Sequence, residues 1–415
     1  MKVYKFGGAS VKDVKSIKNF VSVLQKIPVE NAVIVVSAMG KMTNAFEEIV
    51  NAYFNNKKDV STKIDFVRNF HQSILNELFL DKSDFIYTQI DQIFMQIIGF
   101  LSSNKEKNYH YVYDQIVSKA ELISTKILSA FLKQNKIENK WLDARDYIFT
   151  DANYRQANVD FSKTDAKTKE LKRDNLYITQ GFIASTINGE TTTLGREGSD
   201  YSAAIFAYAL DAEELSIFKD VPGVLNADPK LIGNTVLIEE MSYKEAIEMA
   251  FYGASVIHPK TIQPLKSKNI PLYVKSFLEP LKKGTIIRNK VKIKPEIPCY
   301  IEKQHQNLIS ITTKDFSFIN EKNISEIFSL LSKHQLKVNL IQNTAISFSL
   351  CLEDFNGNFK SFLKDINITF NTKYNNNVKL LTVRHFNDEV VQKIEKVNKI
   401  LVKQTTRETV QFVVM

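Results

Sequence analysis

The sequence has 415 residues, 44% of them hydrophobic and 24% charged, which is enough for two or three domains with large cores. No unbroken apolar stretch reaches the roughly 18 residues that cross a membrane, and no basic segment with an apolar run behind it opens the chain, so we expect a cytoplasmic protein without membrane contact. The net charge of +9 would suit nucleic-acid binding, but the lysines are scattered singly, so we predict a solvated surface and no nucleic-acid partner.

The first two-thirds of the sequence predict alternating strands and helices. Short β-branched runs in residues 1–6 and 31–40 end in small residues, and helical patterns follow both. Residues 61–135 carry apolar residues three and four positions apart, which indicates a long helical region. Strands return at 175–185 and 215–221, with another helix between them. This order predicts an α/β fold with a mainly parallel, helix-covered sheet.

The pattern changes near residue 284, where KKGTIIRNKVKIKPEIP mixes glycine, proline and charge without a helical period. We therefore predict a larger domain at residues 1–288 and a smaller α+β domain at 299–415. The smaller domain reads as βαββα followed by a shortened repeat, which ends in the strand TVQFVVM without a closing helix. Its two cysteines, Cys299 and Cys351, suit neither a disulfide framework nor a zinc site, and we expect both to be buried.

A glycine-rich turn follows the first predicted strand. In KFGGAS, Lys5 comes just before Gly7 and Gly8, so backbone N–H groups can approach a phosphate beside a mobile cation. Ser10 can hydrogen-bond an oxygen of the ligand or simply cap the next helix. On its own this stretch would be an ordinary strand-to-helix turn.

Two further stretches combine small residues, hydroxyls and charges. VSAMGKMTN carries Ser37 and Thr43, and TLGREGSDYSAA carries Arg196 and Asp200. Since the carboxyl ends of parallel strands share one edge of a sheet, we expect all three stretches to form one ligand site. The alternative for the last stretch is a helix cap made by Ser199 or Asp200. GKMT lacks the first glycine of a Walker motif, and no GxGxxG occurs.

These blocks resemble the aspartokinases of the amino-acid kinase family. The similarity covers nearly all of residues 1–288 and includes KFGGAS, VSAMGKMTN, AELIS, GREGSDYSA, FKDVPGVLNADPK and MSYKEAIEMAFYGASVIHPKTI. Such enzymes transfer the γ-phosphoryl group of ATP to the side-chain carboxylate of L-aspartate, giving 4-phospho-L-aspartate for lysine, threonine and methionine synthesis. The resemblance implies a kinase domain at 1–288, ACT-like repeats at 299–415 that regulate or form a homodimer, and a need for ATP and Mg²⁺.

The resemblance also implies a role for each matched residue. Lys5 would act on the phosphates and the transition state, and Asp200 would organise Lys5. Aspartate would be held by Arg196 at a carboxylate, by Glu121 at the α-ammonium and by the hydroxyl of Thr43. The implied ATP-binding residues are Lys5, Gly7, Gly8, Ser10, Ser37, Lys219, Asp220, Leu225, Lys230 and Ser255. No protein ligand for a metal is predicted, and no general base is needed, because an ionised carboxylate attacks directly.

Departures from the family pattern leave alternatives open. Leu225 replaces a tyrosine beside the nucleotide and Ser255 replaces a lysine, while Glu121 could instead be an exposed helix residue. Another amino-acid kinase, acting on glutamate, acetylglutamate or a nucleotide, would share the glycine turns. A degenerate kinase kept as an amino-acid-sensing or assembly subunit is the non-enzymatic alternative, although Lys5, Arg196 and Asp200 are all retained.

Regulation is a separate question. In VNLIQNTAIS, Asn339 and Ala345 stand where relatives that bind lysine tend to carry acidic residues. Each lost charge-assisted hydrogen bond would cost about 1.5 to 3 kcal/mol. We therefore expect the C-terminal domain to serve mainly dimerisation and lysine to inhibit weakly or not at all, unless Asp315 or Glu321 supplies the missing charge.

Overall fold

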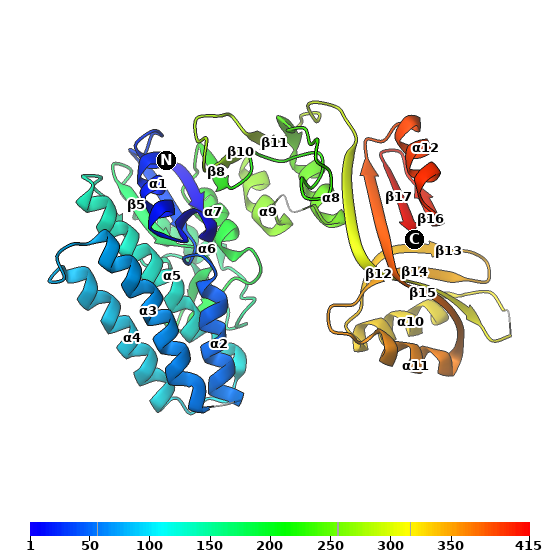
Figure 1. Ribbon diagram of the computed structural model, residues 1–415, viewed down its shortest axis with the longest axis horizontal. Coiled ribbons are helices and arrows are strands. Elements are labelled where there is room, and N and C mark those ends of the chain that lie inside the picture. The colour runs from blue at the N-terminus through cyan, green and yellow to red at the C-terminus, as the bar shows by residue number, and fades with distance from the viewer. Residues whose placement is uncertain (56, 255–256, 316) are drawn as a thin grey trace. The chain divides into compact units, whose positions relative to one another are not determined.

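The computed structural model describes residues 1–55, 57–254, 257–315 and 317–415. Its described residues form two compact units, coloured from blue to red along the chain in Figure 1. Unit 1 comprises Met1–Val224, Leu237–Ile247 and Val256–Lys294, and unit 2 comprises Leu225–Val236, Glu248–Ser255 and Pro295–Met415. Two short segments inside the predicted larger domain thus cluster with unit 2. Within the described ranges, no helix is long and apolar enough to cross a membrane.

An eight-stranded sheet forms the centre of unit 1. In spatial order its strands are β3 (Lys140–Trp141), β5 (Leu176–Gln180), β2 (Ala32–Val36), β1 (Lys2–Phe6), β8 (Glu214–Lys219), β10 (Leu272–Ser276), β11 (Thr285–Arg288) and β9 (Glu240–Ser242). Every pair of neighbours is parallel except β10 and β11. All residues of β2 and β5 are buried, which explains the unbroken apolar sequence of β2, AVIVV, and the apolar start of β5. The predicted parallel α/β sheet is confirmed.

A small second sheet in unit 1 corrects one expectation. It consists of β4 (Phe149–Thr150), β6 (Ile183–Thr186) and β7 (Thr191–Thr193). The stretch 175–185 is therefore two strands in two sheets, because the chain turns at Gly181 and at Phe182, whose φ is +71°. TLGREGSD follows β7 of this small sheet rather than a strand of the central sheet.

Helices surround the sheets of unit 1. They are α1 (Val14–Leu24), α2 (Met42–Asn55), α3 (Val60–Leu78), α4 (Phe85–Ser103), α5 (Tyr109–Gln134), α6 (Phe161–Thr168), α7 (Gly198–Ala209) and α9 (Pro259–Lys268), with short 3₁₀ turns η1 (Gly8–Val11), η2 (Lys57–Asp59) and η3 (Ala144–Asp146). The predicted helical region 61–135 is three helices, α3 to α5, which pack side by side (Figure 1). The helices and the sheet share one core cluster, which includes Phe46 of α2, Phe94 of α4 and Leu128 of α5. Helix α8 (Tyr243–Tyr252) contributes residues to both units.

Unit 2 is built on a six-stranded antiparallel sheet. In spatial order its strands are β13 (Lys337–Asn343), β14 (Phe348–Glu353), β12 (Cys299–Thr313), β15 (Phe370–Arg384), β17 (Thr409–Val414) and β16 (Ile400–Thr405). The long strands β12 and β15 pair along most of their length, and β12 carries irregularities near His305, whose φ is +56°. The helices are α10 (Glu321–Lys333), α11 (Phe359–Thr369) and α12 (Asp388–Val397). Cys299 and Cys351 are buried, as predicted.

The sequence pattern missed strand β16. The expected order after α12 was a single terminal strand, whereas the structure has β16 and β17 as an antiparallel pair. Most of β16 is partly or fully exposed, so its lysine and glutamine hide the alternating pattern that predicts strands. The second half of the sheet is therefore βαββ, one strand richer than the pattern indicated.

Candidate active site

Two lysines and one carboxylate meet at the carboxyl edge of the central sheet. Lys5 lies in β1, and its Nζ is 2.5 Å from Oδ1 of Asp200 in the first turn of α7. Lys219 ends the neighbouring strand β8, and its Nζ is 3.9 Å from Oδ2 of the same carboxylate. Burial alone would raise the pKa of Asp200, but the two ammonium groups outweigh burial and hold that pKa below its ordinary value. The site thus keeps a buried anion that fixes two cations.

The glycines after β1 allow two backbone turns to touch. A Cβ on Gly8 would lie 2.7 Å from the carbonyl oxygen of Ala38 and 2.8 Å from that of Gly40, both closer than real contacts allow. The Gly40 N–H donates to the Gly8 carbonyl at 3.0 Å, and the Ser37 N–H donates to the Phe6 carbonyl at 3.1 Å. KFGGAS and VSAMG therefore lie in direct contact, as the sequence predicted.

Glu121 is a buried carboxylate with one oxygen left open. It lies in α5 and is 2% exposed, so the alternative of an exposed helix residue is wrong. Burial raises its pKa to about 8, although a backbone hydrogen bond from Ala38 and the Lys5 ammonium both oppose that shift. Among the described residues, its Oε2 has no hydrogen-bond partner. A buried acceptor without a donor is costly, so this atom is suited to a cationic ligand.

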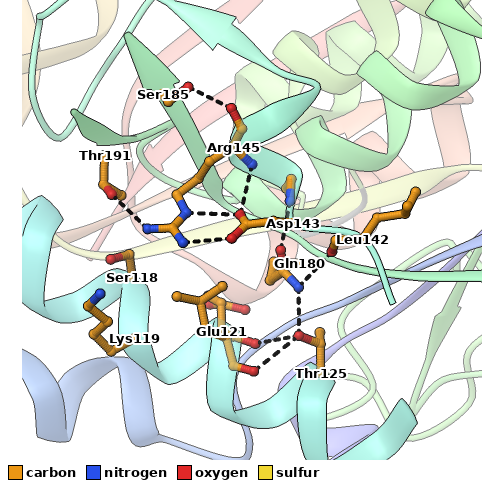
Figure 2. A network of polar contacts seen from close by, with 12 residues as sticks. Ser118, Lys119, Glu121, Thr125, Leu142, Asp143, Arg145, Gln180, Ser185 and Thr191 are labelled. Carbon is orange, nitrogen blue, oxygen red and sulfur yellow. Dashed lines mark hydrogen bonds and ion pairs between the residues drawn. The ribbon is translucent and has the colours of Figure 1, made fainter. Parts of the chain in front are cut away.

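A polar network holds α5 against the ends of the strands (Figure 2). The Thr125 hydroxyl donates to the Glu121 carbonyl at 3.0 Å and accepts a hydrogen bond from Gln180 Nε2 at 2.7 Å. Ser124 Oγ donates to the Ser37 carbonyl at 2.8 Å. Gln180 ends β5 and was missed from the sequence, although LYITQG repeats the pattern of KFGG, with a polar residue and a glycine after an apolar run. These bonds place Glu121 beside the ends of β2 and β5.

The remaining candidates for binding an amino acid lie at helix starts. Thr43 is half-buried in the first turn of α2, directly after the Gly40 turn. Arg196 is exposed in the turn between β7 and α7, which is closed by a bond from Gly198 N–H to the Gly195 carbonyl at 3.0 Å. The N-cap of α7 is Glu197, whose side chain does not cap the helix. The alternative in which Ser199 or Asp200 caps this helix is therefore wrong.

The candidates for binding ATP are spread over both units. Ser10 is buried in η1 and does not cap α1, because the N-cap there is Asp13. Asp220 is exposed directly after β8. Leu225 and Lys230 belong to unit 2, where Leu225 is half-buried and Lys230 is exposed. Ser255 lies outside the described residues.

Comparison with known proteins identifies the family. Residues 1–276 match the amino acid kinase family. The lysine-sensitive aspartokinase 3 of Escherichia coli (strain K12) is 31% identical over 356 residues, which cover 85% of this chain and 78% of that protein. A crystal structure of E. coli aspartokinase III in complex with lysine and aspartate has a TM-score of 0.86 at 26% identity, covering 100% of this chain and 95% of that chain. The same enzyme in complex with aspartate and ADP gives a TM-score of 0.80 at 26% identity, covering 100% and 96%. This chain therefore belongs to the amino acid kinase family and, within it, to the aspartokinases.

Proposed function

We propose that this protein is an aspartate kinase, which transfers the γ-phosphoryl group of ATP to the side-chain carboxylate of L-aspartate and forms 4-phospho-L-aspartate. The observation that carries the proposal is the open Oε2 of buried Glu121 near the cluster of Lys5, Asp200 and Lys219. One sheet edge thus offers an anion for an amino group and cations for phosphate and carboxylate groups. The aspartate and ADP bound by the E. coli relative support the same ligands here.

In this proposal three side chains hold aspartate. Glu121 pairs with the α-ammonium, which gives its open oxygen a donor. Arg196, exposed in its turn, pairs with a carboxylate through its planar guanidinium, and Thr43 adds a hydroxyl. Binding by two opposite charges selects an amino acid over a simple carboxylic acid.

The phosphoryl transfer itself then needs positioning and charge. An oxygen of the ionised side-chain carboxylate attacks the γ-phosphorus, the bond from that phosphorus to the bridging oxygen breaks, and ADP leaves with the electron pair. Lys5 neutralises the charge that develops on the transferring group, and Asp200 holds Lys5 in place. The backbone N–H groups of Gly7 and Gly8 face the phosphates.

Mg²⁺ would enter with the phosphates of ATP, where it neutralises their charge, and the exposed Asp220 is a carboxylate at the same end of β8 that suits such a cation. Lys219 is a further cation at this edge. The roles of Ser10, Ser37, Leu225, Lys230 and Ser255 in binding ATP stay predictions from the family resemblance.

We also propose that unit 2 is ACT-like and forms a homodimer. Its exposed apolar side chains include Phe318, Phe355 and Ile368, which a partner subunit would remove from water. Light scattering of the full chain should give twice the monomer mass, and Ile368→Asp should shift the protein toward the monomer. A cytoplasmic location stays a prediction.

A coupled assay of ADP release with a panel of acceptors tests the function. We expect release that depends on L-aspartate, with the acyl phosphate trapped by hydroxylamine as a hydroxamate. Preference for glutamate, acetylglutamate or a nucleotide would indicate another amino-acid kinase. No release with any acceptor, from a protein that still binds aspartate, would indicate a non-catalytic sensing subunit.

A further inference from the structure

A second buried carboxylate lies in α5, away from the phosphate edge. Asp114 is 0% exposed, and its two oxygens accept hydrogen bonds from three donor groups in two other segments. The Thr193 N–H donates to Oδ2 at 2.9 Å, the Thr193 hydroxyl donates to Oδ1 at 2.7 Å, and the Arg155 N–H donates to Oδ2 at 3.0 Å. Burying a carboxylate costs free energy unless hydrogen bonds compensate for the lost water. The hydrogen bonds of Asp114 compensate for this cost and at the same time fix two loop segments against α5.

The segments that Asp114 joins surround the turn that carries Arg196. Thr193 is the last residue of β7, three positions before Arg196. A Cβ on Gly195 would lie 3.1 Å from the Arg155 carbonyl oxygen, so the loop that contains Arg155 lies directly against this turn. The Ala157 N–H donates to the Thr193 carbonyl at 3.0 Å, which joins the same loop to the end of β7.

The same loop also reaches the helix that carries Thr43. The Arg155 guanidinium lies over the Tyr113 ring, 4.1 Å from its centroid, and its Nη2 is 3.1 Å from Oε1 of Glu47. Glu47 lies one helical turn after Thr43 in α2. Asp114 therefore stands where α5, the Arg196 turn and α2 meet.

We propose that Asp114 is a positioning residue for the amino-acid substrate, because its carboxylate fixes the Arg196 turn against the helix that bears Glu121. This inference rests on the proposed aspartate kinase activity. Arg196 is exposed in the turn from Gly195 to Gly198, so its own packing does little to hold it. A turn that is held before the substrate arrives binds more tightly than one that must be ordered on binding.

The variant Asp114→Asn tests this role with little change in shape. In the place of Oδ1 the new NH₂ group ends the 3.2 Å contact from the Arg155 N–H and forces the Thr193 hydroxyl to accept instead of donate. The negative charge that strengthens every one of these bonds is also lost. We expect the KM for aspartate to rise about tenfold, with kcat changed by less than about threefold and the KM for ATP unaltered. Thr193→Val, which removes a single donor, should raise the KM for aspartate by about threefold.

Asp151→Asn is the matched control. Asp151 is an exposed carboxylate of the same loop that accepts the N–H groups of Asn153 and Asn158 rather than those of the Arg196 turn. We expect its KM values to match those of the wild type. If Asp114→Asn leaves the KM for aspartate unchanged, or raises both KM values together, Asp114 is not a positioning residue for this substrate.

Hydrogen exchange gives a readout independent of turnover. In the ligand-free protein, amides 193–199 should exchange faster in Asp114→Asn than in the wild type or in Asp151→Asn, while the strands of the central sheet stay equally protected. Equal exchange at 193–199 would overturn the inference even if the enzyme is active. If the wild type shows no aspartate-dependent ADP release, the proposed function fails, and the exchange rates still decide whether Asp114 holds the turn.

Discussion

Three buried charges of unit 1 gather at one edge of the central sheet, whereas the buried Arg384 of unit 2 pairs within its own unit. Lys5, Asp200 and Glu121 all lie at the carboxyl ends of parallel strands. Arg384 of unit 2, in contrast, donates to Thr409 on the neighbouring strand and pairs with the exposed Glu408. Parallel strands bring their turns to a shared edge, while antiparallel hairpins divide turns between both ends.

The two units also differ in how fully their polar groups are satisfied. Glu121 Oε2 has no donor among the described residues. In unit 2 the Lys303 ammonium donates to Asn339 Oδ1 at 2.8 Å, and Asn339 Nδ2 donates to Gln306 Oε1 at 2.7 Å. We infer that unit 1 carries a charge which a ligand must balance, whereas these polar groups of unit 2 are satisfied by one another. Substitutions of the charges in unit 1 should therefore change kcat or KM. Substitutions of paired charges in unit 2 should instead change the free energy of unfolding.

The largest effect is expected from Lys5→Met. This change removes a cation fixed by Asp200 at the site of phosphoryl transfer, so kcat should fall about a hundred- to a thousandfold while the KM for aspartate changes far less. Lys2→Met, at the opposite end of β1, is the control and should keep its kcat. An unchanged kcat in Lys5→Met would remove Lys5 from its proposed role.

Glu121→Gln tests whether the open oxygen binds the substrate ammonium. The KM for aspartate should rise about ten- to a hundredfold, which corresponds to a lost charge-assisted hydrogen bond, while the KM for ATP stays close to that of the wild type. Arg196→Met should likewise raise the KM for aspartate and leave the KM for ATP close to that of the wild type. Steady-state kinetics with each substrate varied in turn separates the two constants, and a joint rise would point to a role in folding or closure instead.

The raised pKa of Glu121 predicts a pH dependence. With a pKa of about 8 the carboxyl group is largely protonated at pH 7, and it must lose its proton to pair with an ammonium. The KM for aspartate should therefore fall about tenfold between pH 7 and pH 9, with proton release on binding that calorimetry in different buffers can detect. In Glu121→Gln the KM for aspartate should no longer change between pH 7 and pH 9. A wild-type KM that rises over this range would show that Glu121 does not pair with the substrate ammonium.

Arg384→Met tests the internally paired charge of unit 2. It should lower the free energy of unfolding of that unit by about 1 to 3 kcal/mol, because Thr409 and Glu408 lose a buried donor. Urea unfolding measures the loss, with the exposed neighbour Arg407→Met as the control. The KM values should stay unchanged, and a selective rise in the KM for aspartate would show that this charge serves the substrate.

The smallest effect is expected from added lysine. Asn339 already accepts the ammonium of the chain's own Lys303, and Ala345 supplies no acid, so millimolar lysine should change the rate by less than about twofold. Assays with lysine, threonine and methionine check this prediction. Strong cooperative inhibition by lysine would instead point to Asp315 or Glu321 as the acidic groups, although the Asp315 carboxylate already accepts the Ser317 N–H and hydroxyl.

Local patterns in the sequence determined most elements of unit 1 and the residues that line its sheet edge. Alternating β-branched runs and helical periods predicted the parallel sheet, and the glycines of KFGGAS and VSAMG predicted that their turns would meet. Such features depend on neighbouring residues, so a continuous stretch of chain is enough to reveal them. The family resemblance added Glu121 and its proposed task.

Only the tertiary structure decided how the charges are placed. It buries Glu121 with one open oxygen, joins Asp200 to two lysines, and sets Asp114 between segments that lie far apart in the sequence. The stretch YVYDQIV gave no sign of Asp114 beyond an acid in an apolar run, and the polar strand β16 was missed altogether. The burial and pKa of a charge depend on groups that only folding brings together, so no local pattern can encode them.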